Sequence, residues 1–148
     1  MADDDSAQLW KLNQRLLTRV MNAAEPQLAA LGIETKEFFV LDEVDTCRYP
    51  AELAAKLMLP KASITTYLRN LVAAGLVRRE IDEGDLRRHR LATTPRGREV
   101  LERALAALAG EFTTMMSRLD AHERAEFRRT LLKLLDTGSD VEGDRRGP

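Results

Sequence analysis

Apolar side chains recur every three or four residues along nearly the whole chain, and alternate with polar ones in only one short stretch. That stretch follows Gly75, where Leu76–Ile81 and Arg88–Thr93 have strand-like alternation and flank the turn-forming segment Asp82–Asp85. A period near 3.6 residues predicts helices, and a period of two predicts strands. We therefore expect a mainly α fold with one small β-hairpin, an α+β arrangement.

Glycine and proline residues divide the helical part of the chain. Glycine ends helices readily, and proline is tolerated at a first turn but removes a backbone donor inside a helix. We expect Pro26 to kink or interrupt the first helix, which stops at Gly32. The other helices are expected over about 35–47, from Pro50, over about 61–74, from Thr94-Pro95, and over about 121–135.

Composition allows an ordinary hydrophobic core, since 44% of the 148 residues are hydrophobic. The single cysteine, Cys47, cannot form an internal disulfide, and no secretory pattern is present at either end. These features predict a cytoplasmic protein. The apolar runs are far shorter than the roughly 20 residues that cross a bilayer, so no membrane partner is expected.

Charge is distributed unevenly, although the formal net charge is only -1. Residues 61–98 carry 9 Lys and Arg against 4 Asp and Glu, whereas residues 1–60 carry 6 against 10 and residues 99–148 carry 8 against 10. A basic middle between acidic ends is typical of a DNA reader held in a non-DNA scaffold. A solvated charge run is the alternative, and charge alone does not separate the two.

A short helix, a turn, a second helix and a hairpin form a winged helix-turn-helix plan, whose second helix enters the major groove. Helical spacing places Ile64, Leu68, Leu71 and Val72 on the inner side of that helix. The opposite side is small, polar and basic, and we predict that it contacts double-stranded DNA through Ala62, Thr65, Thr66 and Arg69. Lys61 and Ser63 in the first turn would position the helix on a phosphate.

The predicted hairpin, or wing, is unusually basic for a solvent loop. Arg87 falls near its tip, and alternation places Arg88 and Arg90 on one face of the returning strand, with His89 between them. A narrow minor groove concentrates negative potential and attracts arginine. We therefore add these four residues to the predicted DNA contacts.

Three blocks of the sequence resemble the MarR (multiple antibiotic resistance regulator) family of bacterial transcription factors. They are Leu31–Leu41, the helix-turn-helix from Glu52-Leu53-Ala54 to Arg79, and the wing. In the wing, the spacing of Arg79, Asp82, Asp85 and Arg87 is similar to the family's Arg-Asp-Asp-Arg pattern and leads into Thr94–Gly97. The chain departs from the family pattern at Glu34 and Pro60, where capping threonine or serine residues are usual.

The resemblance implies a homodimeric transcription regulator that binds a pseudo-palindromic operator, with Asp85 holding Arg87 for the minor groove. It also implies repression relieved by a small-molecule effector, bound between the dimerising helices and the DNA lobe; constitutive or activating binding stays open. The candidate lining residues are Trp10, Arg15, Phe38 and Phe39, although core packing is an alternative for both phenylalanines. Recognition helices in a dimer would lie about 34 Å apart.

Apolar seams at both ends of the chain agree with dimerisation. Leu9, Leu12, Leu16 and Val20 line one side of the first helix, and a heptad seam comprises Leu101, Leu105, Leu108, Phe112, Met115 and Leu119. We expect a single domain over residues 7–137, with dimerisation helices in 7–33 and 95–137 and the winged lobe in 35–94. Residues 1–6 and 138–148 are expected to be disordered tails.

Other functions have weaker support in the sequence. No phosphate-binding loop, nucleophile elbow or metalloprotease helix is present, and neither His89 nor His122 has ligand partners at metal-binding spacing, so we expect no enzyme, cofactor or metal site. Cys47 as a redox sensor is an alternative that the resemblance permits, but a lone cysteine is more often a core residue. A protein-interaction module that has lost specific DNA binding is the other alternative.

Overall fold

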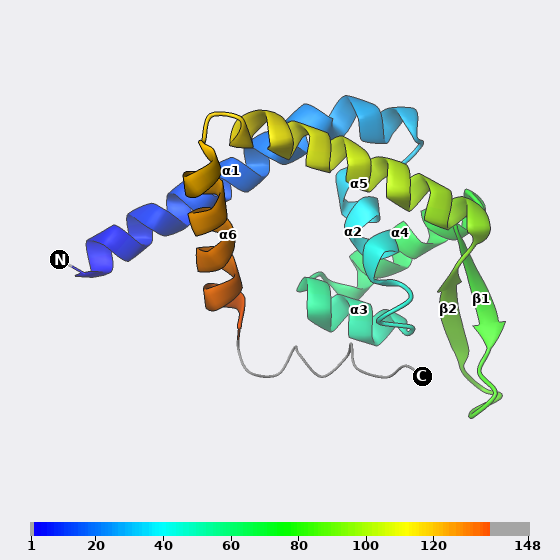
Figure 1. Ribbon diagram of the computed structural model, residues 1–148. Helices are drawn as coiled ribbons and strands as arrows, with labels where there is room; N and C mark the ends of the chain where they lie inside the picture. The colour runs from blue at the N-terminus through cyan, green and yellow to red at the C-terminus, as the bar shows by residue number, and fades with distance from the viewer. Residues whose placement is uncertain (1, 137–148) are drawn as a thin grey trace, which may run out of the picture. The chain divides into compact units, whose positions relative to one another are not determined.

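The computed structural model describes residues 2–136 and contains two compact units, Met1–Glu111 and Phe112–Pro148. The elements in chain order are α1 (Ala2–Ala30), α2 (Thr35–Glu43), α3 (Pro50–Leu57), α4 (Lys61–Ala73), β1 (Val77–Ile81), β2 (His89–Thr93), α5 (Pro95–Met116) and α6 (Ala121–Leu135), as Figure 1 shows. The predicted fold class, helices with one β-hairpin, is confirmed.

The core of the first unit is built around α4, which contacts α2, α3 and β1. Its inner side chains Ile64, Leu68 and Leu71 are buried, as the helical spacing predicted, whereas Val72 is only partly buried. They join buried residues of the neighbouring elements, Leu41, Val44, Leu53, Leu76 and Val77. The packing of α4 therefore fixes which of its sides faces outward.

Three helices of this unit end on residues with left-handed backbone. Gly32 has φ +80° and Gly75 has φ +73°, and the next amide in each case reaches back five residues, from Ile33 to Leu28 and from Leu76 to Leu71. The predicted glycine stops are confirmed. Helix α3 ends in the same way at Met58, with φ +50°, although a side chain is disfavoured there.

The antiparallel hairpin pairs Val77 with Thr93 at its base and Ile81 with His89 near its turn. Helix α5 begins immediately after β2, and the Thr94 hydroxyl accepts the Gly97 amide at 3.0 Å, which confirms Thr94 as the cap. Gly97 lies so close to the base of β1 that an added Cβ would be 2.0 Å from the Leu76 carbonyl oxygen. Only glycine allows this approach of helix to strand.

Three expectations about the helices differ from the structure. Pro26 does not interrupt α1, which runs on to Ala30, and the flanking side chains of Ala24 and Leu28 are completely buried. Helix α1 also begins at Ala2, within the segment that was expected to be a tail through Ser6. Helix α2 ends at Glu43 and not near Cys47. The predicted tail over 138–148 lies outside the described residues.

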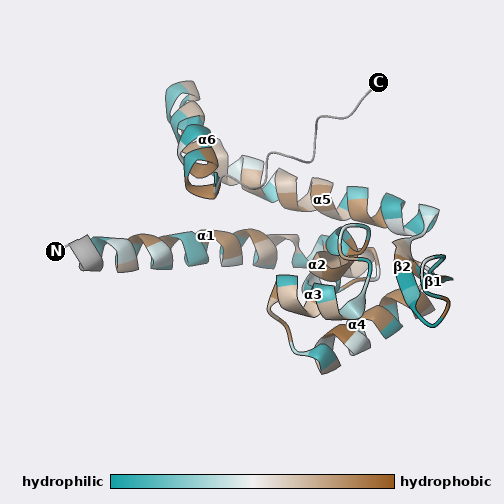
Figure 2. Cartoon of the chain, turned by 90° about the horizontal axis from the view of Figure 1, so that it is seen from below, coloured by the Kyte–Doolittle hydropathy of each residue, from teal (hydrophilic) through white to brown (hydrophobic). Residues whose placement is uncertain are grey.

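The N-terminal half of α1 has many exposed apolar side chains. Figure 2 shows this half extending away from α2, α3 and α4, with brown, apolar segments along it. Leu9, Trp10, Leu12 and Leu17 are all at least 49% exposed. Across residues 2–136, no helix combines the length and apolar character that a membrane span requires.

The second unit contains the end of α5 and all of α6. A capping box starts α6: the Asp120 carboxylate accepts the Glu123 amide at 2.9 Å, and the Glu123 carboxylate accepts the Asp120 amide at 2.8 Å. The rings of Phe112 and Phe127 lie 6.4 Å apart, yet no residue of α6 is fully buried. Its exposed apolar side chains are Leu131, Leu132, Leu134 and Leu135.

The approach at Gly97 gives a test of this fold. We expect Gly97→Ala to destabilise the protein by about 1–3 kcal/mol or more, because backbone atoms of Leu76 have no room to move. Gly110→Ala, also within α5, is the control: nothing lies within 4 Å of its added Cβ, so it should stabilise the helix by up to about 1 kcal/mol. Urea unfolding measures both, and equal effects would contradict the close approach.

Candidate nucleic-acid interface

The outer side of α4 has the composition expected of a recognition helix. Ala62, Thr65, Thr66 and Arg69 are all exposed, and Lys61 and Ser63 lie in the first turn as predicted. Pro60 precedes the helix with φ -58° and forms no side-chain cap, so the first-turn amides are not occupied by a capping side chain. The helix thus presents small, polar and basic groups beside amides that suit a phosphate.

The two threonines of this side bond to their own helix. The hydroxyl of Thr65 donates to the Lys61 carbonyl oxygen at 3.0 Å, and that of Thr66 donates to the Ala62 carbonyl oxygen at 3.1 Å. These bonds hold both side chains in fixed rotamers. Each threonine can therefore contact a partner through its methyl group and through the remaining lone pairs of its hydroxyl oxygen.

The wing turn is shaped by two aspartates. The Asp82 carboxylate accepts the Gly84 amide at 2.9 Å, and the Asp85 carboxylate accepts the Arg87 amide at 3.0 Å. The resemblance implied that Asp85 holds Arg87, and the structure places that contact on the backbone of Arg87 instead of on its guanidinium. Asp85 therefore sets the path of the chain at the tip.

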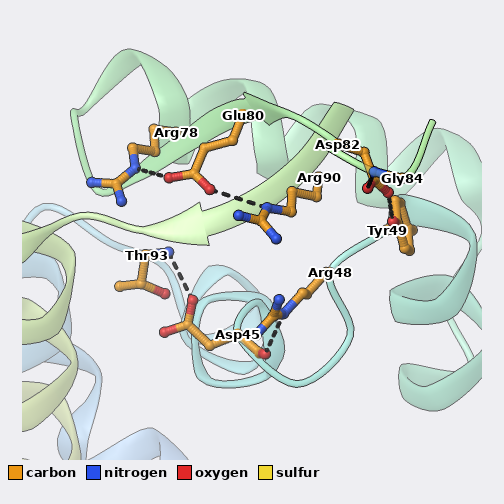
Figure 3. Close-up of polar contacts among 9 residues, drawn as sticks. All are labelled: Asp45, Arg48, Tyr49, Arg78, Glu80, Asp82, Gly84, Arg90 and Thr93. Carbon is orange, nitrogen blue, oxygen red and sulfur yellow. Dashed lines mark hydrogen bonds and ion pairs between the residues drawn. The ribbon is translucent and has the colours of Figure 1, made fainter. Parts of the chain in front are cut away.

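Arg90 is held within the hairpin itself. It lies opposite Glu80 in the strand register, and its Nε donates to the Glu80 carboxylate at 3.2 Å. The other oxygen of Glu80 accepts from Arg78 at 2.6 Å, so one carboxylate joins two arginines along one face (Figure 3). The charge of Arg90 is thus partly neutralised.

The loop between α2 and α3 anchors the wing to the helical core. Asp45 accepts the Thr93 amide at 2.9 Å, and the Arg48 carbonyl oxygen accepts the Leu91 amide at 2.7 Å. Tyr49 donates its hydroxyl to Asp82, and the Arg88 guanidinium carbon lies 3.8 Å from the centroid of the Tyr49 ring. This anchoring loop was not predicted from the sequence, because its contacts join residues that lie more than thirty positions apart.

The hydrogen bond between Tyr49 and Asp82 shifts two pKa values in opposite directions. The Tyr49 hydroxyl first, and the Gly84 amide second, hold the pKa of Asp82 below its ordinary value. The same bond raises the pKa of Tyr49 above its ordinary value, because the phenol proton is shared with a carboxylate. Hydrogen bonds from Arg78 likewise lower the pKa of Glu80. Both lowered pKa values keep Glu80 and Asp82 ionised at neutral pH.

The predicted DNA contacts fall into two groups in the structure. Arg88 and Arg90 have partners within the protein, whereas His89 is exposed at the start of β2. Within residues 5–136, no hydrogen bond or ion pair occupies the charged groups of Lys61, Arg69 and Arg87, which are exposed. These three cations are the ones free for phosphate or base edges.

The predicted effector residues lie on two helices of the first unit, α1 and α2. Phe38 is buried and meets the half-exposed Phe39 edge to face with ring centroids 5.4 Å apart, while Trp10 and Arg15 are exposed on α1. A cavity of about 420 Å³ is lined by Ala29, Gly32, Ile33, Glu34, Glu37 and Asn70, and a second, of about 350 Å³, adjoins it at Ile33 and reaches Tyr67. None of the four predicted residues lines either cavity, so their role stays a prediction.

The structure also describes Cys47 and the side chains that commonly bind metals. Cys47 is a free, buried thiol just beyond α2. In the described part of the chain, no group of three or more His, Cys, Asp and Glu side chains has the arrangement of a metal site.

Comparison with known proteins agrees with this geometry. The sequence model described as MarR family matches residues 38–88, from α2 to the wing. The HTH-type transcriptional repressor Rv2887 of Mycobacterium tuberculosis (strain H37Rv) is 33% identical over 131 residues, which are 84% of this chain and 92% of that protein.

Two solved structures of Rv2887 have a similar fold. The complex with DNA gives a TM-score of 0.70 at 28% identity and covers 85% of this chain and 96% of that one. The complex with p-aminosalicylic acid gives 0.71 at 29% identity and covers 85% and 97%.

The fold and the site together define a winged helix-turn-helix protein. More particularly, the identity and coverage of the relative show that this chain belongs to the MarR family of transcription regulators. The family resemblance inferred from the three sequence blocks is confirmed.

The pKa shift of Asp82 gives a direct test of the wing geometry. A lowered folded pKa stabilises the protein above the ordinary aspartate pKa of about 3.9, and that stability is lost as pH falls through the folded value. In Tyr49→Phe the main cause is removed, so we expect the Asp82 midpoint to rise toward its ordinary value in a carboxyl ¹³C NMR titration. Glu80, whose partners are arginines, is the internal control. An unchanged Asp82 midpoint would refute the bond.

Proposed function

We propose that this protein is a transcriptional repressor that binds a pseudo-palindromic operator as a homodimer and leaves it when a small-molecule effector binds. The single observation that supports this most is that, within the described part of the chain, the cations of Lys61, Arg69 and Arg87 on α4 and the anchored wing are unpaired. Phosphate contacts supply affinity and base contacts supply specificity, and this surface contains groups for both. The protein is non-catalytic and acts in the cytoplasm.

The dimer is supported by apolar surface that one chain leaves uncovered. Exposed leucines on α6 and the apolar side chains of α1 would be covered by a second copy. We propose that residues 7–33 and 95–137 supply these dimer contacts, and that residues 35–94 form the DNA lobe. A two-fold axis would then present both recognition helices to one side of the duplex.

The chemical class of the effector is proposed from the ligand of the relative Rv2887. Rv2887 has been solved with p-aminosalicylic acid, which supports testing small aromatic acids for release of the operator. The sites to compare are the cavity beside Glu37 and the predicted residues Trp10, Arg15, Phe38 and Phe39.

Selection of genomic fragments followed by sequencing tests the repressor role, and should recover an inverted repeat with half-sites about one helical turn apart. We expect Arg87→Ala to weaken binding to that repeat by about 1–3 kcal/mol in a fluorescence-anisotropy titration. Arg103→Ala, an exposed arginine on α5, is the control and should bind as the wild type does. Failure to enrich any repeat would favour the interaction module instead.

The dimer is tested by placing a charge in the exposed apolar surface of α6. Leu134 is 73% exposed in the single chain, so Leu134→Glu should fold but sediment as a monomer at micromolar concentration, because burying the new charge is costly. Arg124→Glu, in the first turn of the same helix, should leave the dimer mass unchanged. A Leu134→Glu variant that remains dimeric would exclude this surface.

A further inference from the structure

Tyr49 occupies a fixed place beside the wing. It precedes Pro50, the first residue of α3, and has φ -124° and ψ 144°. A residue before proline is confined to this extended region, so the backbone of Tyr49 is held by its neighbour. Its side chain is half-buried and lies against the wing (Figure 3).

One aromatic side chain contacts both arms of the wing. The Tyr49 hydroxyl donates to Asp82, at the end of β1, and the ring lies under the guanidinium of Arg88, just before β2, at 3.8 Å. Asp82 and Arg88 are themselves joined across the turn, since the Asp82 amide donates to the Arg88 carbonyl oxygen at 3.0 Å. A cation this close to a ring face is attracted by the ring quadrupole.

Adjacent arginines are thus placed differently. Both side chains are exposed, but Arg88 is stacked on a ring beside an ionised carboxylate. Within the described residues, Arg87 is held through its backbone amide and no contact holds its guanidinium. Withdrawing Arg88 from its ring would cost the stacking energy before any contact with DNA was made. Arg87 incurs no such cost.

We propose that Tyr49 is a positioning residue that holds the wing by stacking on Arg88 and bonding to Asp82, so that Arg87, and not Arg88, contacts the operator. The inference rests on the proposed DNA binding, and it assigns the wing arginines different roles. Arg88 acts on DNA affinity only through Tyr49.

The contact is tested first in the free, full-length protein. The Tyr49 ring should shift the Arg88 Nε–H proton upfield in a ¹H–¹⁵N spectrum of the arginine side chains. Tyr49→Phe keeps the ring and should keep this shift, while Tyr49→Leu should lose it. Identical Arg88 shifts in all three proteins would overturn the proposal, and circular dichroism checks that each variant is folded.

Operator titrations at several salt concentrations test the division of roles. Each cation that contacts phosphate contributes close to one unit to the slope of log affinity against log salt. Arg87→Gln should therefore weaken binding and reduce the slope by about one unit. Arg88→Gln should weaken binding severalfold at unchanged slope, because it removes the stacking and no DNA contact.

The double variant completes the cycle. If Arg88 acts through Tyr49, then Tyr49→Leu combined with Arg88→Gln should bind no more weakly than Tyr49→Leu alone, which we expect to be about tenfold weaker than wild type. A slope reduced by Arg88→Gln, or additive losses, would overturn this inference and leave the repressor role intact. A wild type that binds no repeat would overturn the repressor role and this inference with it.

Discussion

Burial of one side of α4 is the constraint on which the DNA-facing surface depends. Ile64, Leu68 and Leu71 are removed from water together, and each buried side chain of this size contributes about 1.5–3 kcal/mol. Because α2, α3 and β1 all pack against this side, the helix cannot rotate without exposing it. The polar side that begins at Ala62 is therefore presented by the core itself.

The wing depends on contacts of another kind. A two-stranded hairpin is marginal in water by itself, and the loop at Asp45, Arg48 and Tyr49 supplies hydrogen bonds and a ring contact from outside the hairpin. At the base of the hairpin, the absence of a side chain at Gly97 lets the first turn of α5 pack directly against the backbone of Leu76. Apolar packing thus fixes the orientation of α4, and polar contacts fix the position of the wing.

The sequence predicted what is decided locally. Glycines at 32 and 75, proline at 50 and threonine at 94 mark helix ends by their own backbone chemistry, and the two-residue period marks the hairpin. An interruption of α1 at Pro26, one of the two effects predicted for this proline, does not occur, because the turns on either side of it are packed at Ala24 and Leu28.

The candidate site was only partly predictable, because some of its contacts join residues that lie far apart in the sequence. The outward position of Thr65, Thr66 and Arg69 follows from helical spacing. The partners of Arg88 and Arg90 do not, since nothing in the local pattern relates Tyr49 to a hairpin that begins 28 residues later at Val77. An aromatic residue fixed before a helix-starting proline is the one signal in the sequence that could have pointed to this contact, and it was not used.

The hydroxyl protons of Thr65 and Thr66 are already used by backbone carbonyl oxygens one turn earlier. On this face both side chains can accept hydrogen bonds but cannot donate them without breaking a bond to the helix. In the major groove, the amino groups of adenine and cytosine are donors, and thymine presents a methyl group instead. On the proposed function, the two threonines would therefore suit A·T pairs, which present both an amino group and a methyl group in the major groove, and Arg69 would pair with guanine.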